Sequence, residues 1–188
     1  MRKRKDIGFS RKKASDISLW LEDYNDIFSD FDPRPYFQKA LSDDFLQEIK
    51  RASKDKAGTI ELRLFIPKKG RDREEEINIR NRLKEHFKKH YLQLKTEVGR
   101  IKKKGISMTF AGVLMIMIAT YLSYNGSNNL FSHFFQVLFE AGGWFTGWTG
   151  LDQIFYTAEN KRNDLEFYFK MSKCKIFFFS VTKGKFFK

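Results

Sequence analysis

A short loop with two prolines, residues 32–36, carries the residue types best suited to holding an anionic ligand that also contains a ring. The prolines stiffen the backbone, so Arg34 and Tyr36 are presented together. Arginine forks onto phosphate and stacks on bases, and tyrosine also stacks. Arg63, beside Glu61 on the polar face of a predicted strand, is a third candidate. We predict that Arg34, Tyr36 and Arg63 bind a ligand; the alternative is a structural loop anchor and a cross-strand ion pair.

Motifs for covalent, metal-dependent or cofactor-dependent catalysis are missing from the sequence, including the serine-hydrolase elbow, the phosphate-binding loop and the glycine-rich dinucleotide turn. His86 and His90 have a spacing that could hold a metal, but they lie among lysines and arginines without a third ligand nearby. The carboxylates within residues 22–32 could form a metal or acid–base cluster, although such runs usually form solvated turns and helix caps. We expect no enzymatic activity, no metal and no cofactor.

Glu140 is a different kind of candidate because it lies inside an apolar stretch, residues 130–150. A carboxylate inside a membrane-spanning helix is costly and usually has a role. It could face a pore, pair with His133 or contact another copy of the chain. The neighbouring Gly142 and Gly143 permit close helix approach and favour an oligomer interface. The alternative is a position near the lipid head groups.

The elements that would position these residues begin with a strand at 17–22, a structured loop, a short helix at 43–53 and a clear strand at 59–66. Both strands alternate apolar and polar residues, whereas the helix repeats its apolar residues at helical spacing. A long charged helix is expected at 71–104. Two further alternating runs, 165–171 and 175–181, predict a terminal β-hairpin.

The distribution of cations predicts a membrane segment. All 36 lysines and arginines lie before residue 105 or after residue 160, and the interval contains two apolar stretches, 106–124 and 130–150. Each stretch is about as long as a hydrocarbon core when helical. Because the cations flank the pair, the positive-inside rule places both termini in the cytoplasm. The alternative is a buried helical hairpin in a soluble domain.

The net charge of +13 requires an explanation, and anionic lipid is the simplest one beside a membrane. Lys102, Lys103 and Lys104 precede the first apolar stretch and are predicted to lie at the lipid surface. The N-terminal tail, residues 1–15, is basic as well. We expect no DNA or RNA partner. The single cysteine, Cys174, excludes an intrachain disulfide.

The expected fold is a membrane α+β protein. Its predicted parts are the tail 1–15, the N-terminal part of a β domain at 16–70, the helix 71–104, a transmembrane hairpin at 105–151 and a completing β-hairpin at 152–188. The membrane hairpin returns the chain to its starting side. Strands from both ends can therefore form one small cytoplasmic antiparallel sheet or barrel.

The order of these elements resembles a known family. It resembles the two-transmembrane-plus-β effectors of bacterial anti-phage nucleotide-signalling systems of the Panoptes type. The matching segments, in order, are the strand, the DFDPRPY loop, the SDDFL helix, the ELRLFIP strand, the long basic helix, the two apolar stretches, the GWFTGWTGLD segment and the terminal strands. The resemblance implies a cytoplasmic β domain that senses a cyclic nucleotide. It also implies a membrane part that oligomerises and disrupts the inner membrane.

Two functions remain after this reasoning. The first is a nucleotide-gated effector of the inner membrane, acting as a homo-oligomer. The second is a non-enzymatic membrane scaffold or anchor that recruits a cytoplasmic partner or anionic lipid. Toxicity on expression and its dependence on Glu140 distinguish the two.

Overall fold

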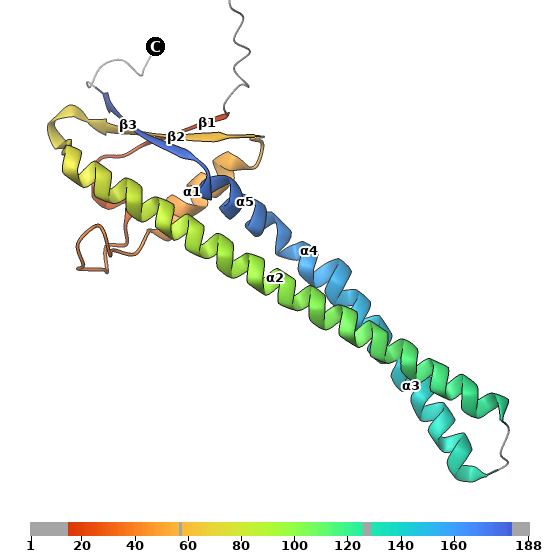
Figure 1. Ribbon diagram of the computed structural model, residues 1–188. Helices are drawn as coiled ribbons and strands as arrows, with labels where there is room; N and C mark the ends of the chain where they lie inside the picture. The colour runs from red at the N-terminus through yellow and green to blue at the C-terminus, as the bar shows by residue number, and fades with distance from the viewer. Residues whose placement is uncertain (1–14, 57, 126–128, 182–188) are drawn as a thin grey trace, which may run out of the picture. The chain divides into compact units, whose positions relative to one another are not determined.

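A computed structural model describes residues 15–56, 58–125 and 129–181. The predicted basic tail and the final residues after 181 lie outside the described residues, except that Ser15 begins the first strand. In chain order the elements are β1 (Ser15–Trp20), a 3-10 helix η1 (Tyr24–Ile27), α1 (Asp43–Ser53), β2 (Ile60–Pro67), a 3-10 helix η2 (Lys68–Gly70), α2 (Arg73–Tyr124), α3 (Leu130–Asp152), a π-helical turn η3 (Gln153–Thr157), α4 (Ala158–Asn160), α5 (Arg162–Ser172) and β3 (Lys175–Val181) (Figure 1).

The chain forms two compact units. The first, called the sheet unit here, consists of residues 1–89 and 167–188, and the second, called the helical unit, consists of residues 90–166. Helix α2 runs through both units without a break, so the predicted helix 71–104 and the apolar stretch 106–124 are one element.

The sheet has three strands in the order β1-β2-β3, and both pairings are parallel. The prediction of an antiparallel sheet or barrel is therefore wrong. β1 is joined to β2 through η1, a loop and the short helix α1, and β2 is joined to β3 through helices α2 to α5. Parallel pairing requires such long connections. The predicted strand 165–171 is also wrong, because these residues belong to α5. Phe167 and Met171 are buried one helical turn apart, whereas Phe169 between them is 38% exposed. The burial therefore follows the helical repeat, not the two-residue alternation that predicted a strand.

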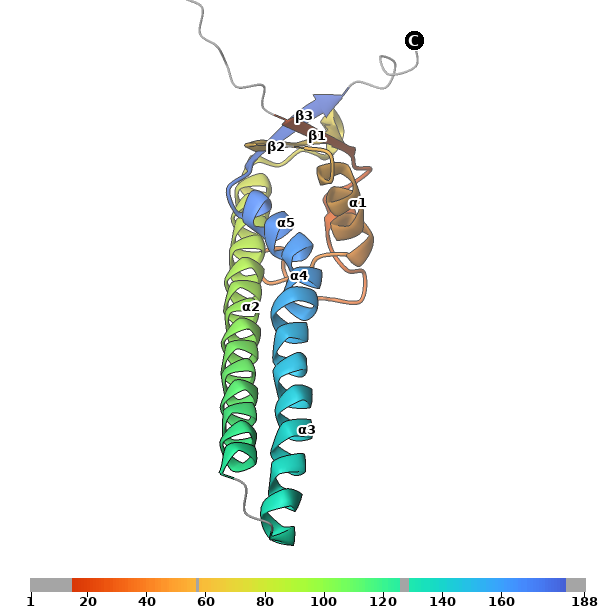
Figure 2. The same ribbon diagram turned by 90° about the vertical axis from the view of Figure 1, so that its right-hand side faces the viewer.

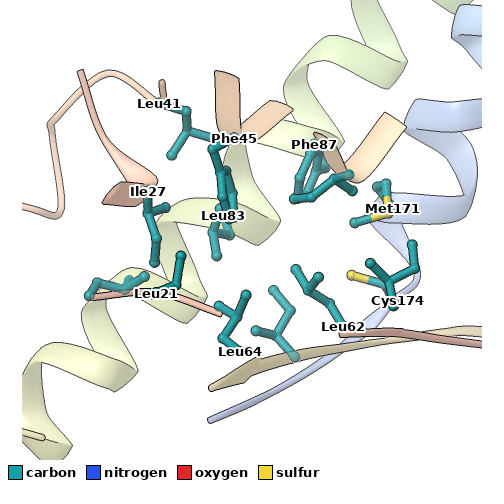
Figure 3. Close-up of a cluster of buried hydrophobic side chains, with 14 of the residues drawn as sticks. Leu21, Ile27, Leu41, Phe45, Leu62, Leu64, Leu83, Phe87, Met171 and Cys174 are labelled. Atoms are coloured by element: carbon teal, nitrogen blue, oxygen red, sulfur yellow. The ribbon is translucent and has the colours of Figure 1, made fainter. Parts of the chain in front are cut away.

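One face of the sheet carries the core of the sheet unit. In β2 every second residue is buried, as the alternating sequence predicts. Helix α1, the first turns of α2 and the end of α5 cover this face, and Figure 2 shows these three segments on the same side of the strands. The buried side chains of these helices pack against those of the strands and loops (Figure 3). The labelled residues of this core are Leu21, Ile27, Leu41, Phe45, Leu62, Leu64, Leu83, Phe87, Met171 and Cys174.

Helix α2 is the one described helix that is long and apolar enough to span a membrane, and only 17% of its apolar stretch is buried. The prediction of a two-helix transmembrane hairpin is therefore wrong, because α3 does not qualify. The polar residues His133, Gln136 and Glu140 lower its hydropathy.

Helices α2 and α3 nevertheless pack against each other inside the helical unit, through glycines. A Cβ added to Gly112 would lie 2.5 Å from the backbone nitrogen of Gly147, and one added to Gly143 would lie 2.9 Å from the carbonyl oxygen of Gly112. Such distances leave no room for a side chain, so the two backbones are in direct contact. Helix contacts of this kind are common in membrane proteins.

Candidate functional site

The loop that follows η1 is organised around one carboxylate. Asp32 accepts hydrogen bonds from Nε and Nη2 of Arg34, at 2.8 and 2.7 Å, and from the backbone N–H groups of Arg34 and Ala40, at 3.1 and 2.7 Å. The side-chain bonds from Arg34, followed by the bond from Ala40, hold the pKa of Asp32 well below its usual range. Asp32 therefore fixes both the loop and the direction of the Arg34 guanidinium, whose side chain is 56% exposed.

Tyr36 is held in place by other aromatic rings. Its ring stacks on Phe28 with centroids 5.2 Å apart and meets the edge of Tyr24 at 6.2 Å. Its hydroxyl lies 3.3 Å from Oδ1 of Asn25, an atom that Lys39 Nζ also contacts at 3.3 Å. Burial raises the pKa of Tyr36, and the negative charges of Glu75 and Asp23 add to this effect. The phenol therefore remains a neutral hydrogen-bonding group.

These loop residues line a cavity of about 430 Å³ in the sheet unit. Its walls come from η1, the loop at 34–39 and the first turns of α2, and the lining residues are Asn25, Arg34, Pro35, Tyr36, Phe37, Lys39, Glu75 and Asn78. The volume is within the range of small-molecule sites. Arg34 and Tyr36, two of the three residues predicted from the sequence to bind a ligand, lie here together.

Sequence reasoning missed the remaining polar lining residues. Glu75 and Asn78 are one turn apart on α2, and only the folded chain brings them to the loop at 34–39. Lys39 carried a weak signal, since it follows Arg34 and Tyr36 in the same loop. Desolvation raises the pKa of Glu75, and the nearby carboxylates of Asp72 and Asp23 raise it further. The cavity thus combines two cations with one carboxyl group whose pKa is raised.

Arg63 lies elsewhere, on the face of the sheet opposite the core. Its Nη1 is 2.8 Å from Asp16 on β1, and its Nη2 is 3.0 Å from Glu61 on the same strand. Asp16 pairs with Glu61 in the sheet register, and the next pair on the same face is Ser18–Arg63. Arg63 is not part of the cavity, and the structure places it in the ion pair that was the alternative interpretation.

A buried polar network supports the wall of the cavity. Glu76, whose side chain is 8% exposed, accepts hydrogen bonds from Nε and Nη2 of Arg71 at 2.6 and 2.9 Å and from the Tyr24 hydroxyl at 3.2 Å. Arg71 also donates to Ser180 on β3 at 2.7 Å. A buried carboxylate is tolerated only with such partners. The network fixes Tyr24, which in turn contacts Tyr36.

The predicted lipid-surface and intramembrane residues lie in the helical unit. Lys102, Lys103 and Lys104 are exposed on α2 directly before the apolar stretch. Glu140 is exposed on α3. Because α3 is not a candidate span, the intramembrane role of Glu140 stays a prediction. Gly143 faces α2 rather than a surface open to another copy.

No metal centre is formed by the described residues, since no group of three or more His, Cys, Asp and Glu side chains has the necessary proximity. His86 is half-buried in the sheet unit, where its ring meets the edge of Phe87 at 5.7 Å and lies 6.5 Å from Tyr168. His90 is half-buried and lies in the helical unit.

Comparison with known proteins finds no match for this chain among family models, curated proteins or solved structures.

Proposed function

We propose that the chain is a membrane-attached receptor for a small anionic ligand that carries a ring, and that it acts as an effector in bacterial nucleotide signalling against phage. The ligand class that we propose is a cyclic nucleotide. The sheet unit is assigned to the cytoplasmic side, and the apolar stretch of α2 is assigned to the inner membrane. The chain is not an enzyme in this proposal.

The cavity at Arg34 and Tyr36 carries the ligand part of the proposal. Arg34 and Lys39 supply positive charge for a phosphate, and the rings of Tyr36 and Phe37 supply surfaces for a base. Asn78 offers an amide group that can both donate and accept hydrogen bonds, as a base edge requires. Because Asp32 and the ring stack fix Arg34 and Tyr36 in advance, little ordering remains to oppose binding.

The apolar surface of the helical unit supports the membrane part. In a water-soluble helix pair, large apolar residues lie between the helices. Here glycines occupy much of that position, and many of the large side chains are exposed instead. Those more than 60% exposed are Ile106, Phe110, Tyr121, Tyr124, Leu130, Phe131, Trp144, Phe145, Trp148, Phe155 and Tyr156. An apolar surface of this extent requires a covering, and lipid is the covering that we propose.

Helix α2 provides a direct connection between ligand and membrane. Glu75 and Asn78 in its first turns line the cavity, and the same unbroken helix contains the apolar stretch at its other end. A ligand that contacts this helix can therefore bias how its apolar end associates in the bilayer. Disruption of the membrane by such association is the output that we propose.

Ligand binding is tested by titrating the purified full-length chain in detergent micelles with cyclic dinucleotides. Linear nucleotides serve as the comparison. The variant Arg34→Ala removes a charge-assisted contact, so binding should weaken about 10- to 100-fold. Arg63→Ala is the matched control and should bind as the parent does. If no nucleotide binds, or if both variants bind equally well, the receptor assignment is wrong.

Inducible expression in bacterial cells with a membrane-potential dye tests the output. Depolarisation that depends on the presence or absence of a cyclic dinucleotide supports the effector. Cells that keep their potential under both conditions favour the second function, a membrane scaffold or anchor. The exposed lysines at 102–104, beside the apolar stretch, suit that function because they can bind anionic head groups.

A further inference from the structure

The face of the sheet opposite the core carries aromatic side chains, and the described helices of the sheet unit all lie against the other face (Figure 2). Trp20, Phe65 and Phe179 form one row across the three strands. Trp20 is 49% exposed and Phe179 is 40% exposed, and the rings of Phe65 and Phe179 stack with centroids 5.5 Å apart. Phe177, 39% exposed, adjoins the row. We refer to this surface as the outer sheet face.

The charges on the outer sheet face cancel. Asp16 and Glu61 are the acids, and Arg63 and Lys175 are the bases; Arg63 pairs with both acids, and Lys175 stands opposite Glu61 in the register. The whole chain, by contrast, has a formal charge of +13. A nucleic acid or an anionic lipid surface attracts unpaired cations. The outer sheet face offers a neutral aromatic surface instead, and this favours a neutral aromatic partner.

We propose that the outer sheet face binds the same face of a second copy of this chain. The arrangement is self-complementary about a two-fold axis that runs along the middle strand, β2. That axis places Asp16 of one copy opposite Lys175 of the other, and Trp20 opposite Phe179, with each contact made twice. Two sheets packed in this way have aligned strands, which is one of the two common sheet-packing arrangements.

The neutral charge also explains why two copies meet here and not elsewhere. Two chains with a net charge of +13 repel each other over most of their surfaces, and this repulsion is smallest where the local charge is zero. Three strands of six to eight residues offer less than the roughly 800 Å² that each partner contributes to a standard interface. The dimer is therefore a weak one that membrane attachment strengthens, since confinement raises the local concentration.

A charge exchange between the two edge strands tests the proposal. Lys175→Glu places like charges opposite each other at both symmetric contacts, so the dimer should dissociate at roughly tenfold higher concentration. The double variant Asp16→Lys/Lys175→Glu restores opposite charges between copies and should dimerise as the parent does. Lys173→Glu is the matched control; it makes the same change in charge near Phe169 on α5, away from the outer sheet face.

Sedimentation equilibrium of the full-length chain in a mild detergent, over a range of protein concentrations, provides the measurement. Thermal unfolding followed by circular dichroism establishes that each variant is folded, and Phe179→Lys replaces any variant that is not. A parent chain that stays monomeric at all concentrations overturns the proposal. A dimer that neither Lys175→Glu nor Phe179→Lys weakens also overturns it, because the contact then lies elsewhere. The nucleotide titration is a separate measurement, so either proposal can fail without the other.

Discussion

At the scale of single residues, the cavity depends on groups whose charge is set by their neighbours. Asp32 stays ionised because Arg34 and two backbone N–H groups bind it, so it partly neutralises the cation that faces the ligand. Glu75 is different, because burial and two nearby carboxylates favour its protonated form. The charge that a ligand meets in the cavity therefore changes with pH mainly through Glu75.

The affinity of the cavity for an anionic ligand should increase as the pH falls. The pKa of Glu75 is raised by burial and by the carboxylates of Asp72 and Asp23, so as the pH falls Glu75 gains its proton earlier than an ordinary glutamate does, and this removes a negative charge from the cavity. Asp32 keeps its charge over the same fall in pH because its pKa is lowered. Calorimetric titration at several pH values provides the measurement. The variant Glu75→Gln should bind the anion more tightly at neutral pH and lose most of the pH dependence; a pH profile identical to that of the parent contradicts this role.

The thiol of Cys174 should be nearly inert while the protein is folded. Burial raises the pKa of Cys174 to about 11, and the residue is 3% exposed in the core. At pH 8 about 0.1% of the thiol is ionised, so alkylation by iodoacetamide should be at least about a hundredfold slower than for a free cysteine. Mass spectrometry of timed samples measures the rate. In denaturant the rate should rise to the free value, and fast labelling of the folded chain contradicts the burial.

At the scale of elements, the glycines between α2 and α3 decide how closely these helices approach. Gly112 faces backbone atoms of α3, whereas Gly99 on the same helix has open space around its Cα. The same substitution at the two positions should therefore have opposite effects. Glycine inside a helix is unfavourable unless close packing requires it.

Gly112→Ala should destabilise the helical unit, and Gly99→Ala should stabilise it by about 0.5–1 kcal/mol. The added methyl group at position 112 would meet the backbone of Gly147, which has no flexible side chain to move aside. Thermal unfolding of both variants in the same detergent provides the comparison. Equal melting temperatures for the two variants would show that α3 does not rest on Gly112.

Several elements were predictable from local sequence pattern, and their pairing was not. The strands near 17–22, 59–66 and 175–181 and the helix at 43–53 all exist within a few residues of the predicted bounds. Whether two strands are parallel or antiparallel depends on the segment that connects them. One wrongly predicted element, residues 165–171, therefore made the predicted sheet antiparallel. Residues 165–171 became a strand in the prediction because aromatic residues alternate there, and a terminal hairpin followed from it. As α5 they form the end of a crossover instead.

The candidate site was predictable in the same partial way. Arg34 and Tyr36 share one stiff loop, so local sequence was enough to group them. Their partners Glu75 and Asn78 come from a helix that begins almost forty residues later, and only tertiary contact reveals them. Arg63 was grouped with the loop by residue type alone, although the alternation of its strand placed it on the face opposite the core.

At the scale of the whole molecule, the sheet joins strands from both sides of the long helix in the sequence. β1 and β2 precede α2, β3 follows it, and all three strands are hydrogen-bonded in one sheet. The sheet unit is therefore complete only when the segments before and after α2 have both been made.

Attachment to the membrane should depend on apolar contact rather than on charge. Replacing Lys102, Lys103 and Lys104 by glutamine removes three exposed cations that attract anionic head groups at roughly 1 kcal/mol each. It leaves the apolar stretch of α2 intact. The triple variant should therefore remain in the membrane fraction after washing with concentrated salt and with alkaline carbonate. Release of the unmodified chain by either wash contradicts insertion of α2.

The central position of β2 also determines the order of biogenesis. β2 is made early, but its partner β3 is made only after α2 and α3, and the Arg71–Ser180 hydrogen bond joins residues 109 positions apart. Pairing over such a separation is slow compared with local helix formation. The apolar stretch of α2 is therefore made while one edge of β2 is still unpaired. The sheet unit gains β3 only after the whole of α2 and α3 has been synthesised.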